Sequence, residues 1–174
     1  MAYRNGTYIA FDGLDETNPT KSDFKYFGMI KAWTERDDCN FECIDSHEKT
    51  DAVRDTSKKI TLKSRIQERL RNSKNMLIIL SPDTRDIGSM LSFEIEQAVD
   101  VYGLPLIIVY TGIEKTYGSF LSTRWPRALT ERINNGTAKA IHIPYKQEPI
   151  QWAIKQFSIN DSIPEGPRVW YTGY

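Results

Sequence analysis

The sequence has few cysteines and no long apolar run. Only Cys39 and Cys43 are present among 174 residues, which is too few for a disulfide framework, and no further zinc ligands lie at a suitable spacing. No stretch approaches the roughly 18 apolar residues of a membrane span. The start of the chain lacks the apolar segment and the cleavage pattern of a secretory signal. We therefore expect a cytoplasmic protein with reduced thiols and no membrane contact.

An excess of charge of either sign is also missing. Lys+Arg and Asp+Glu number 23 each, so the formal net charge is zero. This balance disfavours broad electrostatic binding to nucleic acid. A length of 174 residues suits one domain that can bury a core. We expect that domain over residues 1–157 and an extended C-terminal tail over residues 158–174, which either docks on the domain or meets a partner.

Short apolar runs alternate with helical patterns along the chain. The runs MLIIL and LPLIIVY are continuously apolar, which is typical of parallel strands buried on both faces. The expected strands are 6–11, 41–45, 76–80, 104–110 and 138–143. The expected helices cover residues 22–36, 60–72, the region from about 89 to 102, 127–136 and 148–157.

This alternation predicts an α/β fold. We expect a flavodoxin-like three-layer sandwich, in which a five-stranded parallel sheet in the order 2-1-3-4-5 carries helices on both faces. In such sheets ligands bind beyond the carboxyl ends of the strands, near the point where the strand order reverses. The loops that follow the first four strands are therefore the places to look for a site.

Several well-defined motifs are absent. The sequence has no GxxxxGK[ST] loop, no GxGxxG after its first strand, and neither HExxH nor GxSxG. Ser81 stands where a phosphoreceiver would have an aspartate. The acidic residues Asp12, Asp15 and Glu16 are too irregularly spaced for a calcium loop, and we predict no metal site.

The stretch SMLSFEIEQAV contains two glutamates with different expected surroundings. At about 100° per residue, Glu94 falls inside the apolar arc of the helix, whereas Glu96 falls on the polar side and is expected to be solvated. The apolar arc consists of Leu91, Ile95, Ala98, Val99, Val101 and Tyr102. A carboxylate on a buried face is costly unless it is paired. Glu94 is thus either bonded to a backbone amide or an arginine such as Arg85, or kept for chemistry.

Other polar residues end the expected strands, and each has a structural alternative. Asp12 could bind a ribose hydroxyl or simply form an Asp-Gly turn. Ser81 and Thr84 could donate to phosphate or shape their turn. The second strand ends in Asp45, Ser46 and His47. By contrast, we expect His142 to be a core histidine and Trp125 to be a packing residue.

Three stretches together resemble the Toll/interleukin-1 receptor (TIR) family. TYIAFDG resembles the first-strand box, MLIILSPDTRDIGSMLSFEIEQAV the third strand with its serine-proline ending and glutamate helix, and LPLIIVY the fourth strand. The match is most similar to the TIR-like domains of the bacterial Thoeris anti-phage defence type. It extends roughly from Gly6 to Phe157.

The resemblance implies an enzyme that cleaves the nicotinamide–ribose bond of NAD, with NAD as substrate and no separate cofactor. Glu94 matches the family's catalytic glutamate. By the same resemblance, the ribose and phosphates would be lined by Phe11, Asp12, Asp45, Ser46, His47, Ser81 and Thr84. The product would be ADP-ribose or a cyclic ADP-ribose-type signal. That signal would activate a separate effector protein after a phage trigger, and the enzyme could be a homo-oligomer.

Two other functions stay open at this point. Some TIR domains only assemble, so the chain could be a non-catalytic oligomerising scaffold. It could also be an enzyme like the nucleoside deoxyribosyltransferases, which would use a glutamate on a related topology. Release of nicotinamide from NAD distinguishes the three.

Overall fold

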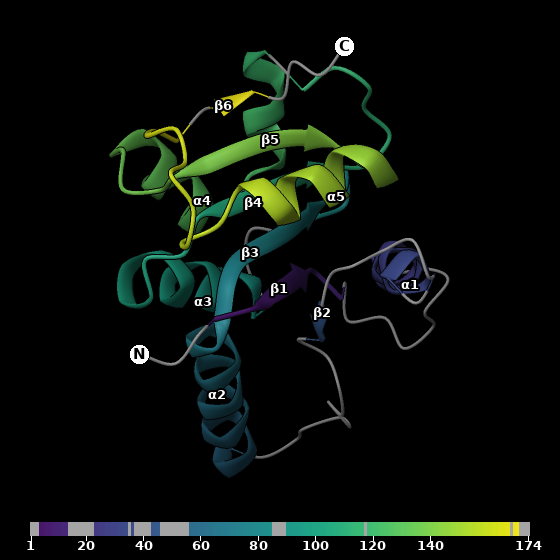
Figure 1. The fold of residues 1–174 in the computed structure, drawn as a ribbon. Helices are drawn as coiled ribbons and strands as arrows, with labels where there is room; N and C mark the ends of the chain where they lie inside the picture. Colours follow the sequence, from purple (N-terminus) through teal and green to yellow (C-terminus); the bar gives the residue numbers. More distant parts are fainter. Residues whose placement is uncertain are drawn as a thin grey trace.

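The fold is an α/β sandwich built on one parallel sheet (Figure 1). The computed structural model describes residues 4–13, 23–34, 36, 43–45, 56–84, 90–116, 118–167 and 169–170. The strands are β1 (Gly6–Phe11), β2 (Cys43–Asp45), β3 (Ser73–Leu80), β4 (Leu106–Tyr110), β5 (Ala140–Pro144) and β6 (Val169–Trp170). The helices are α1 (Phe24–Thr34), α2 (Thr56–Arg71), α3 (Leu91–Glu96), α4 (Arg127–Asn134) and α5 (Gln147–Gln156). A π-helix, η1 (Gln97–Val101), continues α3, and a 3-10 helix, η2 (Ser119–Arg124), precedes α4.

The sheet has six strands in the order β2-β1-β3-β4-β5-β6, and every pair of neighbours is parallel. The α/β class with a parallel sheet is confirmed. The prediction of five strands is wrong, because Val169–Trp170 pairs with β5 and extends the sheet by one strand. A strand of two residues is too short to produce a periodic pattern in the sequence. The central strands β3 and β4 are buried along nearly their whole length, as their continuous apolar runs predict.

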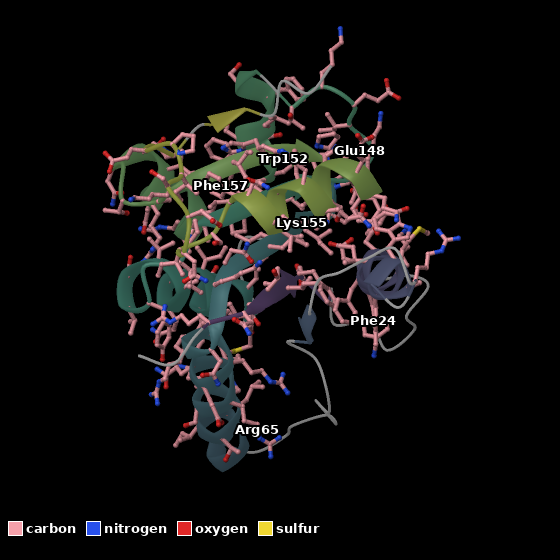
Figure 2. The ribbon with its side chains drawn as sticks, viewed as in Figure 1. Phe24, Arg65, Glu148, Trp152, Lys155 and Phe157 are labelled. Atoms are coloured by element: carbon pink, nitrogen blue, oxygen red, sulfur yellow. The ribbon has the colours of Figure 1, made fainter. Side chains whose placement is uncertain are left out.

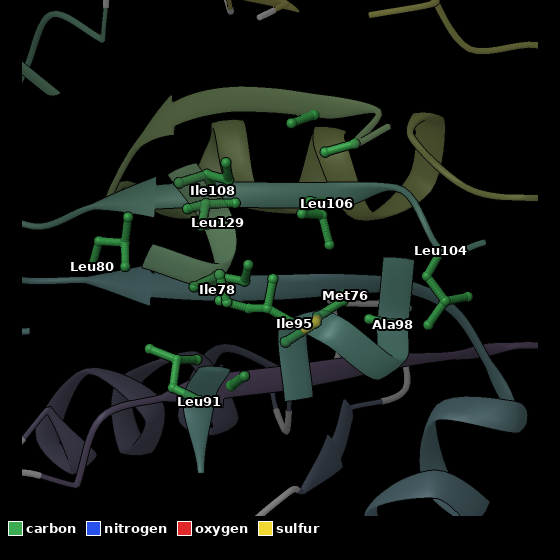
Figure 3. Packing of buried hydrophobic residues seen from close by; sticks show 14 of the residues in the cluster. Met76, Ile78, Leu80, Leu91, Ile95, Ala98, Leu104, Leu106, Ile108 and Leu129 are labelled. Carbon is green, nitrogen blue, oxygen red and sulfur yellow. The ribbon is translucent and has the colours of Figure 1, made fainter. Parts of the chain in front are cut away.

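Successive side chains of each strand point to opposite faces of the sheet, and each face has its own helices. One buried cluster joins the sheet to α2, α3 and α4, and the other joins it to α1 and α5. Figure 3 shows the first cluster, in which Met76 and Ile78 of β3 lie close to Ile95 of α3. Helix α5 turns Trp152 and Lys155 outward on the second face (Figure 2).

The buried pattern of α3 changes at the π-helix. There the amide of Tyr102 donates to the carbonyl of Gln97, five residues earlier, so the turn is wider than an α-helical turn. Ala98 is fully buried, whereas Val101 is 59% exposed. The prediction that Val101 lies on the buried side is therefore wrong, because a wheel drawn at 100° per residue loses its phase where the helix widens.

Part of the predicted tail docks on the domain. The amide of Ala140 donates to the carbonyl of Gly166 at 3.1 Å, and the amide of Ile159 donates to the carbonyl of Lys74 at 2.9 Å. Ile163 packs against the second cluster. The segment that follows α5 thus contacts the start of β3 and then the start of β5 before it forms β6.

The sequence also predicted that the chain has no membrane span and that its thiols are reduced. Within the described ranges, no helix combines the length and the apolar character that a membrane crossing needs. Cys39 lies outside the described residues, and only the backbone of Cys43 is described, so the state of the thiols stays a prediction.

Candidate functional site

Glu94 is buried at the start of α3. The helix begins at Leu91, so Glu94 lies in its first turn, and its side chain is only 3% exposed. Its helix neighbours Leu91 and Ile95 belong to the buried cluster between α3 and the sheet. The predicted burial of this carboxylate is confirmed. Glu96, predicted to be solvated, is instead partly buried.

The carboxylate of Glu94 is bonded through one oxygen. The phenol of Tyr8, in β1, donates to Oε1 at 2.6 Å, and both side chains are buried. Oε2 has no hydrogen-bond partner among the residues that the structure describes. Sequence reasoning offered a backbone amide or Arg85 as the structural partner; Arg85 lies outside the described residues. Buried carboxylate oxygens are usually hydrogen-bonded, so Oε2 is the atom of Glu94 that could accept a bond from a ligand.

The surroundings of Glu94 bring the pKa of its carboxyl group close to neutral pH. Burial raises the pKa of Glu94 to about 7, although the hydrogen bond from Tyr8 and the positive charge of Arg69 both lower it. Arg69 lies in the last turn of α2, which packs on the same face of the sheet. Small changes around this group will therefore change the fraction that is ionised.

A second set of polar groups lies where β1 and β3 end. Asp12 follows β1 and is fully buried, and Asp23, just before α1, is 3% exposed. Ser81 follows β3 and donates from Oγ to Oδ2 of Asp23 at 2.9 Å. Burial raises the pKa of Asp23 to about 6; the Ser81 bond lowers it, and the charge of Asp12 raises it. Asp12 and Ser81, which follow neighbouring strands, thus both act on the same buried carboxyl group of Asp23.

Thr84 shapes the turn after β3. Its Oγ1 accepts a hydrogen bond from the amide of Ser81 at 2.9 Å, and its own amide donates to the carbonyl of Ser81 at 3.3 Å. This is the turn-forming role that the sequence left open. It does not prevent the two hydroxyls from lying beside a ligand at the edge of the sheet.

Two further predicted contacts lie apart from Glu94 or cannot be placed. Phe11 is 3% exposed and stacks on Phe27 with ring centroids 5.6 Å apart, in the cluster on the opposite face of the sheet. Its role in substrate binding stays a prediction. Asp45 ends β2, where its backbone pairs with Ile9. Its side chain is not among those described, and Ser46 and His47 lie outside the described residues.

Sequence reasoning missed Tyr8 and Asp23. Tyr8 is an aromatic residue in an apolar strand, and its contact with Glu94 joins positions 86 residues apart. Asp23 lies at the start of the helix expected over 22–36, and the carbonyl of Asp23 accepts from the amides of Tyr26 and Phe27. The acidic residue next to a helix start was the available signal for Asp23, and no local signal marks Tyr8.

His142 lies in the core, as predicted. Trp125 Nε1 donates to the Tyr110 hydroxyl at 2.7 Å, and that hydroxyl lies 2.8 Å from His142 Nδ1. The other ring nitrogen of His142 lies 3.1 Å from the carbonyl of Pro167, an acceptor, so Nε2 carries the proton and Nδ1 accepts from Tyr110. Trp125 also packs against the first cluster, in agreement with its predicted packing role. Within the described part of the chain, no group of three or more His, Cys, Asp or Glu side chains is arranged to hold a metal ion.

Comparison with known proteins shows a match to one family model and low similarity to two solved structures. The family model for the TIR-like domain of the Thoeris protein ThsB matches residues 8–116, which include both Tyr8 and Glu94. Among solved structures, a 2-desoxiribosyltransferase from Leishmania mexicana is 12% identical, with a TM-score of 0.45 over 64% of this chain and 68% of that chain. The flavoenzyme NAD(P)H:(acceptor) oxidoreductase FerB from Paracoccus denitrificans is 13% identical, with a TM-score of 0.42 over 97% of this chain and 81% of that chain. We draw no inference on function from these two likenesses.

Proposed function

Because the chain belongs to the family of the TIR-like domain of the Thoeris protein ThsB, we propose that it is an enzyme which cleaves the nicotinamide–ribose bond of NAD. The match over more than half of the chain confirms the resemblance read from the sequence. In this proposal Glu94 is the catalytic carboxylate and NAD is the substrate. The product is ADP-ribose or a cyclic ADP-ribose-type signal, made in anti-phage defence.

The burial of Glu94 carries the proposal, together with an Oε2 that has no hydrogen-bond partner in the described part of the chain. Departure of neutral nicotinamide leaves a positively charged, oxocarbenium-like ribose. A fixed carboxylate stabilises that charge, and it does so more strongly where water is excluded. Glu94 fits this role because Oε1 is held by Tyr8 while Oε2 has no partner among the described residues. A carboxylate kept only for structure would be expected to use both oxygens.

The polar groups at the ends of β1 and β3 suit the rest of the substrate. We assign Asp12, Ser81 and Thr84 to the ribose hydroxyls and phosphates, since they lie at the edge of the sheet where ligands of this fold class bind. Asp12 follows Tyr8 by four residues, about 13 Å along an extended strand. A dinucleotide is long enough to contact both places. Phe11 and the segment from Asp45 to His47 stay proposed as neighbouring contacts.

Nicotinamide release tests this function directly. Purified protein is incubated with NAD, alone and with extract of phage-infected cells, and the products are separated by chromatography. We expect nicotinamide release in at least one of these two conditions, because the proposed enzyme acts after a phage trigger. We expect Glu94→Gln to reduce release by about 100-fold or more, the scale of losing one charge-stabilising group.

The matched control is Glu96→Gln, which removes the neighbouring carboxylate of the same helix. It should keep release within a fewfold of the unmodified protein. Equal losses in both variants, or full activity of Glu94→Gln, would contradict the assignment. A scaffold releases no nicotinamide in any condition, and an enzyme like a nucleoside deoxyribosyltransferase prefers deoxynucleosides to NAD.

The same proposal includes two partners. The product activates a separate effector protein, so the released nucleotide should stimulate that effector when this chain has been removed by filtration. In this proposal a homo-oligomer forms during activity, and sedimentation with and without NAD measures it.

A further inference from the structure

We propose that Tyr8 is the positioning residue of Glu94: its phenol fixes the orientation of the carboxylate and keeps it ionised without neutralising its charge. This inference rests on the proposed function, because it gives Tyr8 a role in the same reaction. The contact joins Tyr8 in β1, the first residue of the family match, to Glu94 in the first turn of α3, and Tyr8 belongs to the buried cluster between them.

The geometry makes Tyr8 a rigid donor. Tyr8 is fully buried in β1, an inner strand, with β2 on one side and β3 on the other. Its backbone pairs with Ile44 and Met76, so the root of the side chain is held by two neighbouring strands. A tyrosine has only two side-chain torsions before its ring is fixed, and this ring lies within a packed cluster. The hydroxyl therefore stays where it meets Oε1.

A fixed bond to one oxygen determines what the other oxygen can do. With Oε1 held at 2.6 Å by Tyr8, rotation of the carboxylate is restricted and Oε2 keeps one direction. Catalysis by charge stabilisation depends on such prior orientation, because a group that must first turn loses part of its effect. Oε2 is thus the oxygen that we expect to face the ribose.

A phenol also suits the electrostatics better than a cation would. The hydrogen bond favours the ionised carboxylate but adds no positive charge, so the full negative charge of Glu94 is left for the developing ribose cation. The positive charge of Arg69 in α2 also favours the ionised carboxylate of Glu94. On the far side, Arg132 of α4 is paired with Asp100 and lies near Glu96.

The alternative is that Tyr8 only satisfies a buried acid and so supports the fold. The two roles differ in what removal of the hydroxyl changes. A structural role lowers the stability of the protein and leaves the turnover of the folded fraction unchanged. Loss of the bond moves the pH at which Glu94 ionises in either case, but only a positioning role also lowers kcat while KM stays nearly constant, because the binding groups at the edge of the sheet are intact.

The experiment compares Tyr8→Phe with Tyr145→Phe. Tyr145 is a matched control, since its hydroxyl also donates a hydrogen bond of 2.6 Å, which is partly buried and runs to the carbonyl of Tyr26 on the opposite face of the sheet. The Glu94 carboxyl is followed by carbon NMR across a pH titration of protein labelled at glutamate, and its signal is assigned by its loss in Glu94→Gln. In parallel, kcat and KM for nicotinamide release are measured against pH.

We expect Tyr8→Phe to raise the midpoint of Glu94 by about one pH unit and to lower kcat about tenfold below that midpoint. Tyr145→Phe should leave both unchanged. Equal midpoints in Tyr8→Phe and the unmodified protein would overturn the proposal, as would an equal shift in Tyr145→Phe. If no variant and no condition releases nicotinamide while the midpoint still moves, the proposed function fails and the control of Glu94 by Tyr8 stands.

A second variant covers the case in which Tyr8→Phe does not fold. Incorporation of 3-fluorotyrosine at position 8 keeps the hydroxyl and the ring almost unchanged in size, and the more acidic phenol is a stronger donor. The midpoint of Glu94 should then fall below that of the unmodified protein. A midpoint that does not fall would overturn the proposal.

Discussion

Glu94 costs the folded protein stability whenever it is ionised, and this cost is separable from any activity. Its pKa is raised from 4.5 to about 7 by burial, so the folded state binds the proton more tightly than the unfolded state does. For a group shifted in this direction, the contribution is favourable at low pH and is lost as the pH rises from the unfolded pKa to the folded pKa. Above that range the ionised carboxylate leaves the folded state less stable than a protonated one would.

This cost predicts a pH-dependent difference between the unmodified protein and Glu94→Gln. A shift of about 2.5 units corresponds to about 3 kcal/mol when fully developed. Between pH 5 and pH 8, the free energy of unfolding of Glu94→Gln relative to the unmodified protein should rise by about 2 to 3 kcal/mol. Urea denaturation of both proteins at the two pH values measures it. If the difference in the free energy of unfolding is the same at pH 5 and pH 8, the pKa of Glu94 is not raised in the folded protein.

At the scale of the element, the helix that carries Glu94 is composed of two kinds of turn. The first turn is α-helical and places Glu94 and Ile95 inward, and the following π-helix widens the helix over Gln97–Val101. The side chain of Gln97 accepts a hydrogen bond from Gln67 of α2 at 2.9 Å, so the widened turn is tied to the next helix on the same face. Such turns are frequent at functional sites, and this one directly follows the candidate carboxylate.

The widened turn gives a prediction that a regular helix would not. Ala98→Asp should destabilise the protein by about 3 kcal/mol or more, because it buries an unpaired charge. Val101→Asp should change the stability by less than about 0.5 kcal/mol, because Val101 is 59% exposed. A regular helix would bury both positions and make both changes costly. Thermal and urea unfolding of the two variants decide between these outcomes.

At the scale of the whole molecule, the segment after α5 completes the sheet. It adds β6 beside β5 and supplies the carbonyl of Pro167 to the buried ring of His142. His142 is in turn bonded to Tyr110 of β4, so this contact links the C-terminal segment to the centre of the sheet. The candidate site is therefore built in the half of the sheet formed by β1 and β3, and the opposite edge is stabilised by the segment that returns to it.

Removal of that segment should weaken the domain without abolishing the site. A chain that ends at Asp161 leaves His142 Nε2 without its acceptor and uncovers the cluster beside Ile163. We expect a loss of about 2 kcal/mol in the free energy of unfolding, measured with urea, and an unchanged NMR midpoint for Glu94. A chain that ends at Trp170 is the control and should keep full stability. Equal stability of the two shortened chains would contradict the role given to this segment.

The sequence by itself determined the features that repeat over short distances. The apolar runs of β3 and β4 predicted the buried parallel strands, and the helical period placed Glu94 on the buried side, because burial of one face leaves a regular local pattern. Only the tertiary structure decided that Tyr8 meets Glu94, that Ser81 meets Asp23, and that Val169–Trp170 joins the sheet. These contacts join residues that are far apart in the chain, and their formation depends on how whole elements pack. The helical pattern of the sequence could not predict the exposure of Val101 either, since a single widened turn changes the direction of the side chains that follow it in the helix.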